Sequence, residues 1–149
     1  MTLDACFSSG KDDWETPDDL FNDLDAIYRF TIDAAANQRN HKVDRWYGPG
    51  GEVEDALSVM WPRDEGNIWL NPPYSRGLQA QFVKKAYDAV RPAFSPKSAR
   101  VVCLLPARTD TRLFHEIIFP YGEITFLRGR LKFKGAPSSA PFPSMIVVF

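Results

Sequence analysis

The sequence predicts an α/β fold built on a mostly parallel sheet with an antiparallel C-terminal edge. Helical and strand-like stretches alternate along the chain, and the apolar run VVCLLP is typical of a strand buried on both faces. A hairpin-like pattern of strands follows the last helix. A chain of 149 residues can form one ordinary core. We therefore expect one domain over residues 14–149, preceded by a partly flexible leader over residues 1–13.

The first half of the chain predicts one helix and two strands. In WETPDDLFNDLDAIYRF, Thr16 can cap a helix and Pro17 suits its first turn. Apolar residues then recur at helical spacing: Leu20, Leu24, Ile27 and Tyr28. FTIDAAA predicts a short strand that ends at Asp33, and NIWL predicts a second one. Residues 37–66 are polar and predict at most a short strand near Trp46.

The second half predicts two helices and further strands. A helix is predicted after NPPY, where apolar residues recur at helical spacing, namely Leu78, Phe82, Val83, Ala86 and Val90. Pro92 is expected to end that helix. ARVVCLL is the most strand-like stretch, and TRLFHEIIF predicts a short helix. EITFLRGRLKF predicts two strands around Gly129, and SMIVVF predicts a closing strand.

Polar residues follow three of the predicted strands directly. They are Asp33, the Asn71-Pro72-Pro73-Tyr74 corner, and Arg108 in Pro106-Ala107-Arg108. Ligands of open α/β sheets bind outside the carboxyl ends of the strands. We therefore expect these three stretches to line one edge of the sheet.

The Asn71-Pro72-Pro73-Tyr74 corner has the chemistry to hold a planar amino group. The carboxamide oxygen of Asn71 and the carbonyl oxygen of Pro72 can accept both hydrogens of an exocyclic amine. That geometry exposes the nitrogen lone pair for attack on an electrophilic carbon. Consecutive prolines fix the backbone and add no competing N–H. Tyr74 can offer an aromatic face to a base that has left its helix. The alternative is that the corner is only a stiff loop.

Composition excludes several classes of protein. The net charge of −1 does not suit a protein that coats nucleic acid by charge alone, although contacts to a few phosphates stay open. The start MTLDACFSSGKDD has no signal-peptide pattern, and no apolar run could cross a membrane. We therefore expect a cytoplasmic protein without a membrane partner. The spacing of His, Cys and carboxylate residues predicts no metal site.

The corner and six further stretches resemble a known family. NPPYS after an apolar strand looks like the catalytic motif of S-adenosylmethionine-dependent amino-methyltransferases. Seven stretches, in unbroken order from about residue 7 to the end of the chain, together resemble the phage DNA N-6-adenine-methyltransferase family. The stretches are SSGKDDWETPDDLF, FTIDAAANQRN, EDALSVMW, NPPYSR, LLPARTDTRLFHE, LRGRLKF and APFPSMIVVF.

The resemblance implies a compact Rossmann-like methyltransferase that acts on the N6 amine of adenine in DNA, with S-adenosylmethionine as cofactor. Asn71 and Pro72 would hold the amine, Pro73 would shape the corner and Tyr74 would stack on the base. The residues implied to bind the cofactor are Trp14, Thr16, Pro17, Asp33, Ala34, Ala35, Asp55, Ala56 and Leu57. A phage-encoded enzyme would work in the cytoplasm of the host cell.

One departure from the wider group leaves alternatives open. Where that group has a glycine-rich turn, Asp33 is followed here by Ala34-Ala35-Ala36, which cannot adopt positive φ cheaply. Asp33 could then be a plain turn cap, and the protein could be an inactive nucleic-acid-binding decoy. The same motif also serves methyltransferases of RNA adenine and of protein glutamine.

Residues expected to contact nucleic acid lie in loops or just after strands: Arg76, Arg108, Thr109, Arg128 and Arg130. The alternative is that these arginines are solvated or paired with acidic residues. The chain has no insertion large enough for a separate target-recognition domain. We therefore expect relaxed sequence preference or help from a second subunit, so a homodimer is possible.

Overall fold

A computed structural model describes residues 14–91 and 99–149, and its five strands form one sheet in the order β1-β2-β3-β5-β4. β1, β2 and β3 are parallel, and β5 is antiparallel to both of its neighbours. The reversed strand therefore lies one position in from the C-terminal edge, and β4 runs with the first three. The strands are β1 (Phe30–Asp33), β2 (Asn67–Leu70), β3 (Val101–Pro106), β4 (Glu123–Phe126) and β5 (Ser144–Val148).

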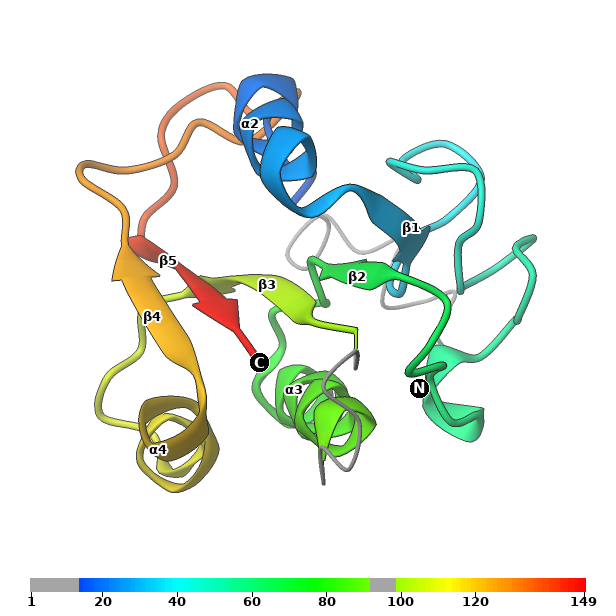
Figure 1. Cartoon of the computed structure of the whole chain (residues 1–149). Helices are drawn as coiled ribbons and strands as arrows, with labels where there is room; N and C mark the ends of the chain where they lie inside the picture. Colours follow the sequence, from blue (N-terminus) through cyan, green and yellow to red (C-terminus); the bar gives the residue numbers. More distant parts are fainter. Residues whose placement is uncertain (1–13, 92–98) are drawn as a thin grey trace.

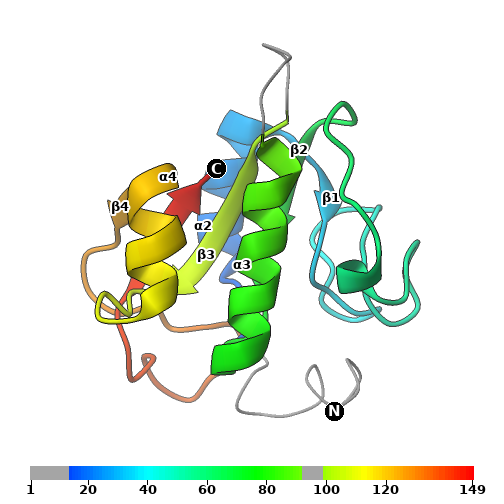
Figure 2. The same cartoon turned by 90° about the horizontal axis from the view of Figure 1, so that it is seen from below.

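Helices cover both faces of this sheet, as Figure 1 shows. Helix α2 (Asp18–Tyr28) lies on one face, and α3 (Arg76–Val90) lies on the other. The short helix after β3 shares the face of α3; it consists of a π-helical segment, η2 (Phe114–Ile118), and α4 (Phe119–Tyr121) (Figure 2). A 3₁₀ turn, η1 (Ala56–Ser58), contacts α3. The mixed α/β class expected from the sequence is confirmed.

The core divides into two layers because side chains alternate across each strand. On the α3 face, Ile68 and Leu70 of β2 pack with Phe82. On the α2 face, Trp69 packs with Phe21, their ring centroids 5.4 Å apart. β3 is buried along its whole length, as its continuous apolar run predicted. None of the helices within the described ranges is both long and apolar enough to cross a membrane.

The structure corrects three local expectations. Pro17, and not Thr16, is the residue before the first turn of α2, and no side chain caps that helix end. Only the first of the two strands expected in EITFLRGRLKF forms. Gly129 turns the chain with φ of 74°. The segment between β4 and β5 then packs through side chains such as Phe133, which is buried in the α2-face layer, and not through strand pairing. Trp46 pairs with Asp33 only as an isolated bridge, so the short strand expected near Trp46 does not form.

Two expectations fall outside the described ranges, namely the flexible leader over residues 1–13 and Pro92 as the end of α3.

A close backbone approach holds the loop that follows β1. Gly48 has φ of 138°, and a Cβ atom there would collide with the carbonyl oxygen of Ala36. The backbone N–H of Ala36 donates to the carbonyl of Tyr47 at 3.0 Å, which keeps the two segments together. The glycine that permits close approach therefore sits opposite the alanines.

We expect Gly48→Ala to lower the free energy of unfolding by about 3 kcal/mol or more, because the new methyl group meets backbone atoms and the φ angle is unfavourable. Urea denaturation measures the change. Gly129→Ala is the matched control: its φ is also positive, but a Cβ there meets no described atom within 4 Å. The control should lose only about 1 kcal/mol, and equal losses in both variants would contradict the steric account.

Candidate active site

The Asn71-Pro72-Pro73-Tyr74 corner connects β2 to α3. The two prolines are buried and present no N–H to the surroundings. The polar residues at the ends of β1 and β3 each lie next to this corner, but they line separate hollows. Asp33 and Asn71 line one pocket, and Arg108 Nη1 donates to the carbonyl oxygen of Tyr74 at 3.1 Å.

The side-chain amide of Asn71 has a determined orientation. Its Nδ2 group donates to the carbonyl oxygen of Trp14 and to Thr16 Oγ1, the latter at 3.1 Å. A carbonyl oxygen can only accept, so the nitrogen must face Trp14 and Oδ1 must face the other way. That Oδ1 is buried and has no hydrogen-bond partner among the described residues. Buried acceptors are nearly always satisfied, so Asn71 presents an oxygen that lacks a donor.

Tyr74 does not offer the open aromatic face that the sequence predicted. Only 3% of the residue is exposed, and its hydroxyl donates to the carbonyl of Leu104 at 3.1 Å. The rings of Phe142 and Phe133 contact it edge-on, with centroids 5.6 and 6.2 Å away. Burial raises the pKa of the phenol, so Tyr74 stays protonated. A base can reach this ring only if the aromatic neighbours move.

Asp33 shapes the loop that follows β1. Its two carboxylate oxygens accept the backbone N–H groups of Ala35 at 3.3 Å and Lys42 at 3.0 Å. Burial raises the pKa of this carboxyl to about 7, although the two backbone hydrogen bonds oppose the shift. Asp33 therefore acts as the turn cap that the sequence left open as an alternative, while it also lines the pocket.

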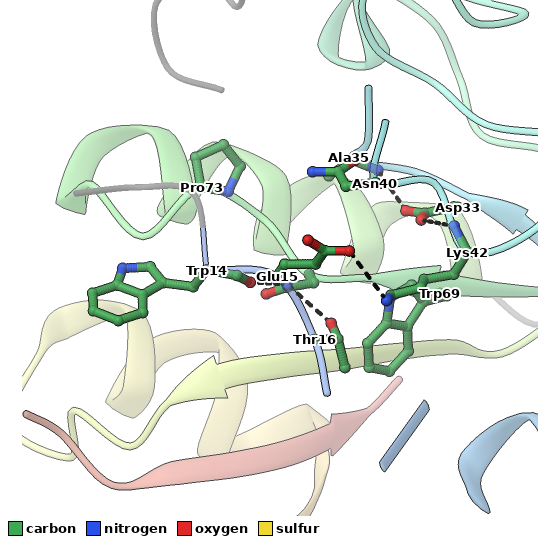
Figure 3. Close-up of a pocket in the computed structure, with 10 residues that line it drawn as sticks. Trp14, Glu15, Thr16, Asp33, Ala35, Asn40, Lys42, Trp69 and Pro73 are labelled. Carbon is green, nitrogen blue, oxygen red and sulfur yellow. Dashed lines mark hydrogen bonds and ion pairs between the residues drawn. The ribbon is translucent and has the colours of Figure 1, made fainter. Parts of the chain in front are cut away.

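The pocket between Asp33 and Asn71 also contains an ion pair (Figure 3). Lys42 Nζ lies 3.7 Å from Glu15 Oε1 and 3.2 Å from Asp18 Oδ1, and only 10% of the lysine side chain is exposed. Lys134 approaches Asp18 at 3.1 Å from the segment after β4. The hydrogen bonds from Lys134 and Lys42 lower the pKa of Asp18. The pocket thus places a carboxylate and an ammonium group side by side.

The residues implied to bind the cofactor divide into two sets. Trp14, Thr16, Asp33 and Ala35 line the pocket together with Asn71. The others lie elsewhere: Pro17 precedes α2, Ala34 is in the core, and Asp55, Ala56 and Leu57 form the start of η1. The Asp55 carboxylate accepts the N–H of Leu57 at 3.0 Å and so caps that turn.

The arginines expected to contact nucleic acid also divide. Arg76 and Arg108 line one groove together with Arg112, next to the corner. Arg128 and Arg130 are exposed in the segment between β4 and β5, and Thr109 is exposed beside Arg108. Arg112 forms an exposed pair with Glu116, its Nε 3.1 Å from Glu116 Oε1.

Sequence reasoning missed four residues that line the pocket, namely Glu15, Asn40, Lys42 and Trp69. Glu15 lies inside the WETP motif and could have been included with its neighbours. Trp69 lies directly before the corner on a strand that was correctly predicted. No local pattern marks Lys42, because it comes from the polar segment that the sequence left unassigned.

The structure also shows the environment of Cys103 and of the residue types that bind metals. Cys103 is fully buried in β3, and burial raises the pKa of its thiol. This environment disfavours the thiolate that a nucleophile needs. Across the described ranges, no three His, Cys, Asp or Glu side chains are grouped so that they could hold a metal ion.

Comparison with known proteins identifies relatives of the whole domain. The model of the family described as DNA N-6-adenine-methyltransferase (Dam) matches residues 5–148. A DNA N-6-adenine-methyltransferase from Escherichia phage T1 is 30% identical over 122 residues, which cover 81% of this chain and 47% of the phage T1 protein. The chain therefore spans about half the length of that curated relative.

The raised pKa of Asp33 predicts how stability depends on pH. Between about pH 4 and pH 7 the folded state keeps a proton that the unfolded state releases, so the free energy of unfolding falls as pH rises. The loss reaches roughly 4 kcal/mol at most. Urea denaturation across this range should show that the free energy of unfolding depends less on pH in Asp33→Asn than in the unmodified protein. The exposed Asp19→Asn variant is the control. An unchanged slope in Asp33→Asn would contradict the assignment.

Proposed function

This chain belongs to the DNA N-6-adenine-methyltransferase (Dam) family, and from that premise we propose that it transfers a methyl group from S-adenosylmethionine to the N6 amine of adenine in DNA. The family resemblance expected from the sequence is confirmed. The observation that supports this function most directly is the buried Oδ1 of Asn71, which has no donor among the described residues.

The proposed chemistry follows from the locked amide of Asn71. Oδ1 accepts one hydrogen of the adenine amine, and the carbonyl oxygen of Pro72 accepts the other. The nitrogen lone pair is thereby directed out of the plane of the base. Bound S-adenosylmethionine supplies an electrophilic methyl group on its sulfonium. With the cofactor bound, the amine nitrogen would take the methyl group while the sulfonium left as the neutral sulfide, and the methylated amine would then release one proton to solvent.

The pocket beside Asn71 has a donor set that fits the amino-acid end of S-adenosylmethionine. That end carries one ammonium and one carboxylate group. Glu15 can bind the ammonium group, and Lys42 can bind the carboxylate. Asp33 holds the loop that contributes Lys42, through the backbone N–H of that lysine. We assign Asp33 mainly to shaping this side of the pocket.

Stacking of the base on Tyr74 requires a rearrangement of aromatic side chains. Phe142 is half-buried and contacts both Tyr74 and Trp14, with centroid separations of 5.6 and 5.2 Å. It lies in the segment between β4 and β5, which forms no strand pairing. Movement of this segment would expose the tyrosine ring, and the entering base would replace the lost ring contacts.

The proposed partner is DNA, and the proposed location is the cytoplasm of a host cell, because the similar protein belongs to a phage. A homodimer stays a prediction.

Asn71→Ala should lower methyl transfer by about 1000-fold, because it removes the proposed acceptor of the adenine amine. The binding constant for S-adenosylmethionine should change far less than the rate of methyl transfer, since Asn71 borders the cofactor pocket but its Oδ1 is assigned to the base. The measurement is transfer of tritium from labelled S-adenosylmethionine to unmethylated DNA, with the product identified as N6-methyladenine. Exposed Asn22→Ala is the control.

Three outcomes of that experiment are informative. Equal loss of transfer and of cofactor binding in Asn71→Ala would contradict the assigned role. Label that enters RNA or protein, and not DNA, would assign the same corner to another acceptor. Absence of cofactor binding in the unmodified protein would favour an inactive nucleic-acid-binding protein.

Thr16→Val tests whether Thr16 positions Asn71 or binds the cofactor. Thr16 is 1% exposed, and its Oγ1 accepts a hydrogen bond from Asn71 Nδ2. Loss of that acceptor should lower kcat about tenfold and leave KM for S-adenosylmethionine nearly unchanged. Thr16→Ser keeps the hydroxyl and should restore most of kcat. A raised KM with unchanged kcat would instead support the cofactor role implied by the resemblance.

A further inference from the structure

A second hollow lies next to the corner, between the start of α3 and the loop after β3. It is larger than the pocket that contains Asp33. Three arginines line it, Arg76, Arg108 and Arg112, together with one acidic residue, Asp110. We call this hollow the arginine groove. Its formal charge is positive even with Asp110 included, so it suits an anion.

Gln79 is the unusual residue of the arginine groove. It lies on the first turn of α3, is only 6% exposed, and its Nε2 is buried. This amide nitrogen has no hydrogen-bond partner within residues 14–91 and 99–149. A buried donor without an acceptor is costly, so this nitrogen calls for an acceptor from outside the described residues.

The N-terminus of α3 adds further hydrogen-bond donors at the same place. Ser75 precedes the helix, and its side chain does not cap the helix end. The first backbone N–H groups of a helix have no acceptor within it, and they carry the positive end of the helix dipole. Gly77 lines the arginine groove, and a Cβ atom at this position would meet no described atom within 4 Å. The missing side chain leaves room for a ligand to approach the backbone.

The arginine groove adjoins the corner. Arg108 bridges the two, because its guanidinium donates to the carbonyl oxygen of Tyr74 at 3.1 Å. Arg76 begins α3 two residues after Tyr74. A nucleotide whose base entered the corner would therefore carry its backbone towards this groove. Arg112 can turn to the same ligand, because its pair with Glu116 is exposed and holds it only weakly.

We propose that the arginine groove binds one of the two DNA phosphates that flank the target adenine, with Gln79 Nε2 and the guanidinium groups of Arg76 and Arg108 as donors. This inference rests on the proposed function, since it places the phosphate relative to the base in the corner. Such a contact positions the nucleotide without reading sequence. Gln79 is thus proposed as a positioning residue that the corner motif does not contain.

The test uses a short duplex that contains an adenine methylated by the wild-type protein. A methylphosphonate replaces one phosphate at a time and removes its charge. Replacement at one flanking phosphate should weaken wild-type binding about tenfold, and replacement six nucleotides away should have less than about a twofold effect. Uniform small effects at every position would overturn the proposal.

Gln79→Leu connects this phosphate to the groove. It should weaken binding of unmodified DNA about fivefold, and the flanking methylphosphonate should then have little further effect. The melting temperature should stay or rise, because a buried unpaired donor is replaced by an apolar group. Gln81→Leu on the same helix is the control, since Gln81 is exposed and does not line the groove. A lowered melting temperature with unchanged DNA binding would show that Gln79 is only structural and would overturn the proposal.

Arg76→Ala is an independent second variant, which covers a Gln79→Leu protein that does not fold. It should weaken DNA binding. The plot of log binding constant against log salt concentration should also become less steep, by the amount that corresponds to about one phosphate contact. An unchanged slope would overturn the role of Arg76 in the groove. Methyl transfer by the wild-type protein with no effect of any flanking methylphosphonate would overturn this inference alone. Absence of both DNA binding and transfer would overturn the proposed function as well.

Discussion

The hydrogen bonds from Asn71 Nδ2 to Trp14 and Thr16 connect two parts of the chain that are far apart in sequence. They tie the segment before α2 to the end of β2, and they turn the amide so that Oδ1 is left without a donor in the described structure. A free asparagine side chain can rotate, and its two ends differ only in whether they donate or accept. The acceptor character of the corner therefore depends on a carbonyl and a hydroxyl that lie outside the motif.

The segment between β4 and β5 closes over this arrangement. Its Lys134 donates a backbone N–H to the carbonyl of Glu15 at 2.9 Å, and its Nζ pairs with Asp18. Phe133 and Phe142 from the same segment contact the rings of Trp14 and Tyr74. The aromatic contacts cover the face that the proposed mechanism needs. Because the segment forms no strand pairing, the movement proposed for it would leave the sheet intact.

The loop after β1 shows how the pocket forms without a glycine-rich turn. Asp33 accepts two backbone N–H groups of the loop, and the alanines that follow it pack into the core or beside the pocket. Positive φ is needed on the facing segment, at Gly48, where a side chain would strike Ala36. This replacement for the turn depends on a contact between residues twelve positions apart. It also keeps a carboxyl buried, whose pKa is raised to about 7.

The sequence by itself determined the strands and helices of regular pattern and the chemistry of the corner. FTID, NIWL and VVCLLP form strands because their apolar side chains can be buried, and Asn71-Pro72-Pro73-Tyr74 follows β2 as expected. Local pattern could not show that Thr16 accepts from Asn71, that Lys42 reaches Glu15, or that Tyr74 is covered by Phe142. These contacts join residues from different segments of the chain. Only the packing of the sheet between its helices decided them, because hydrogen bonds and ring contacts depend on distances that sequence separation does not contain.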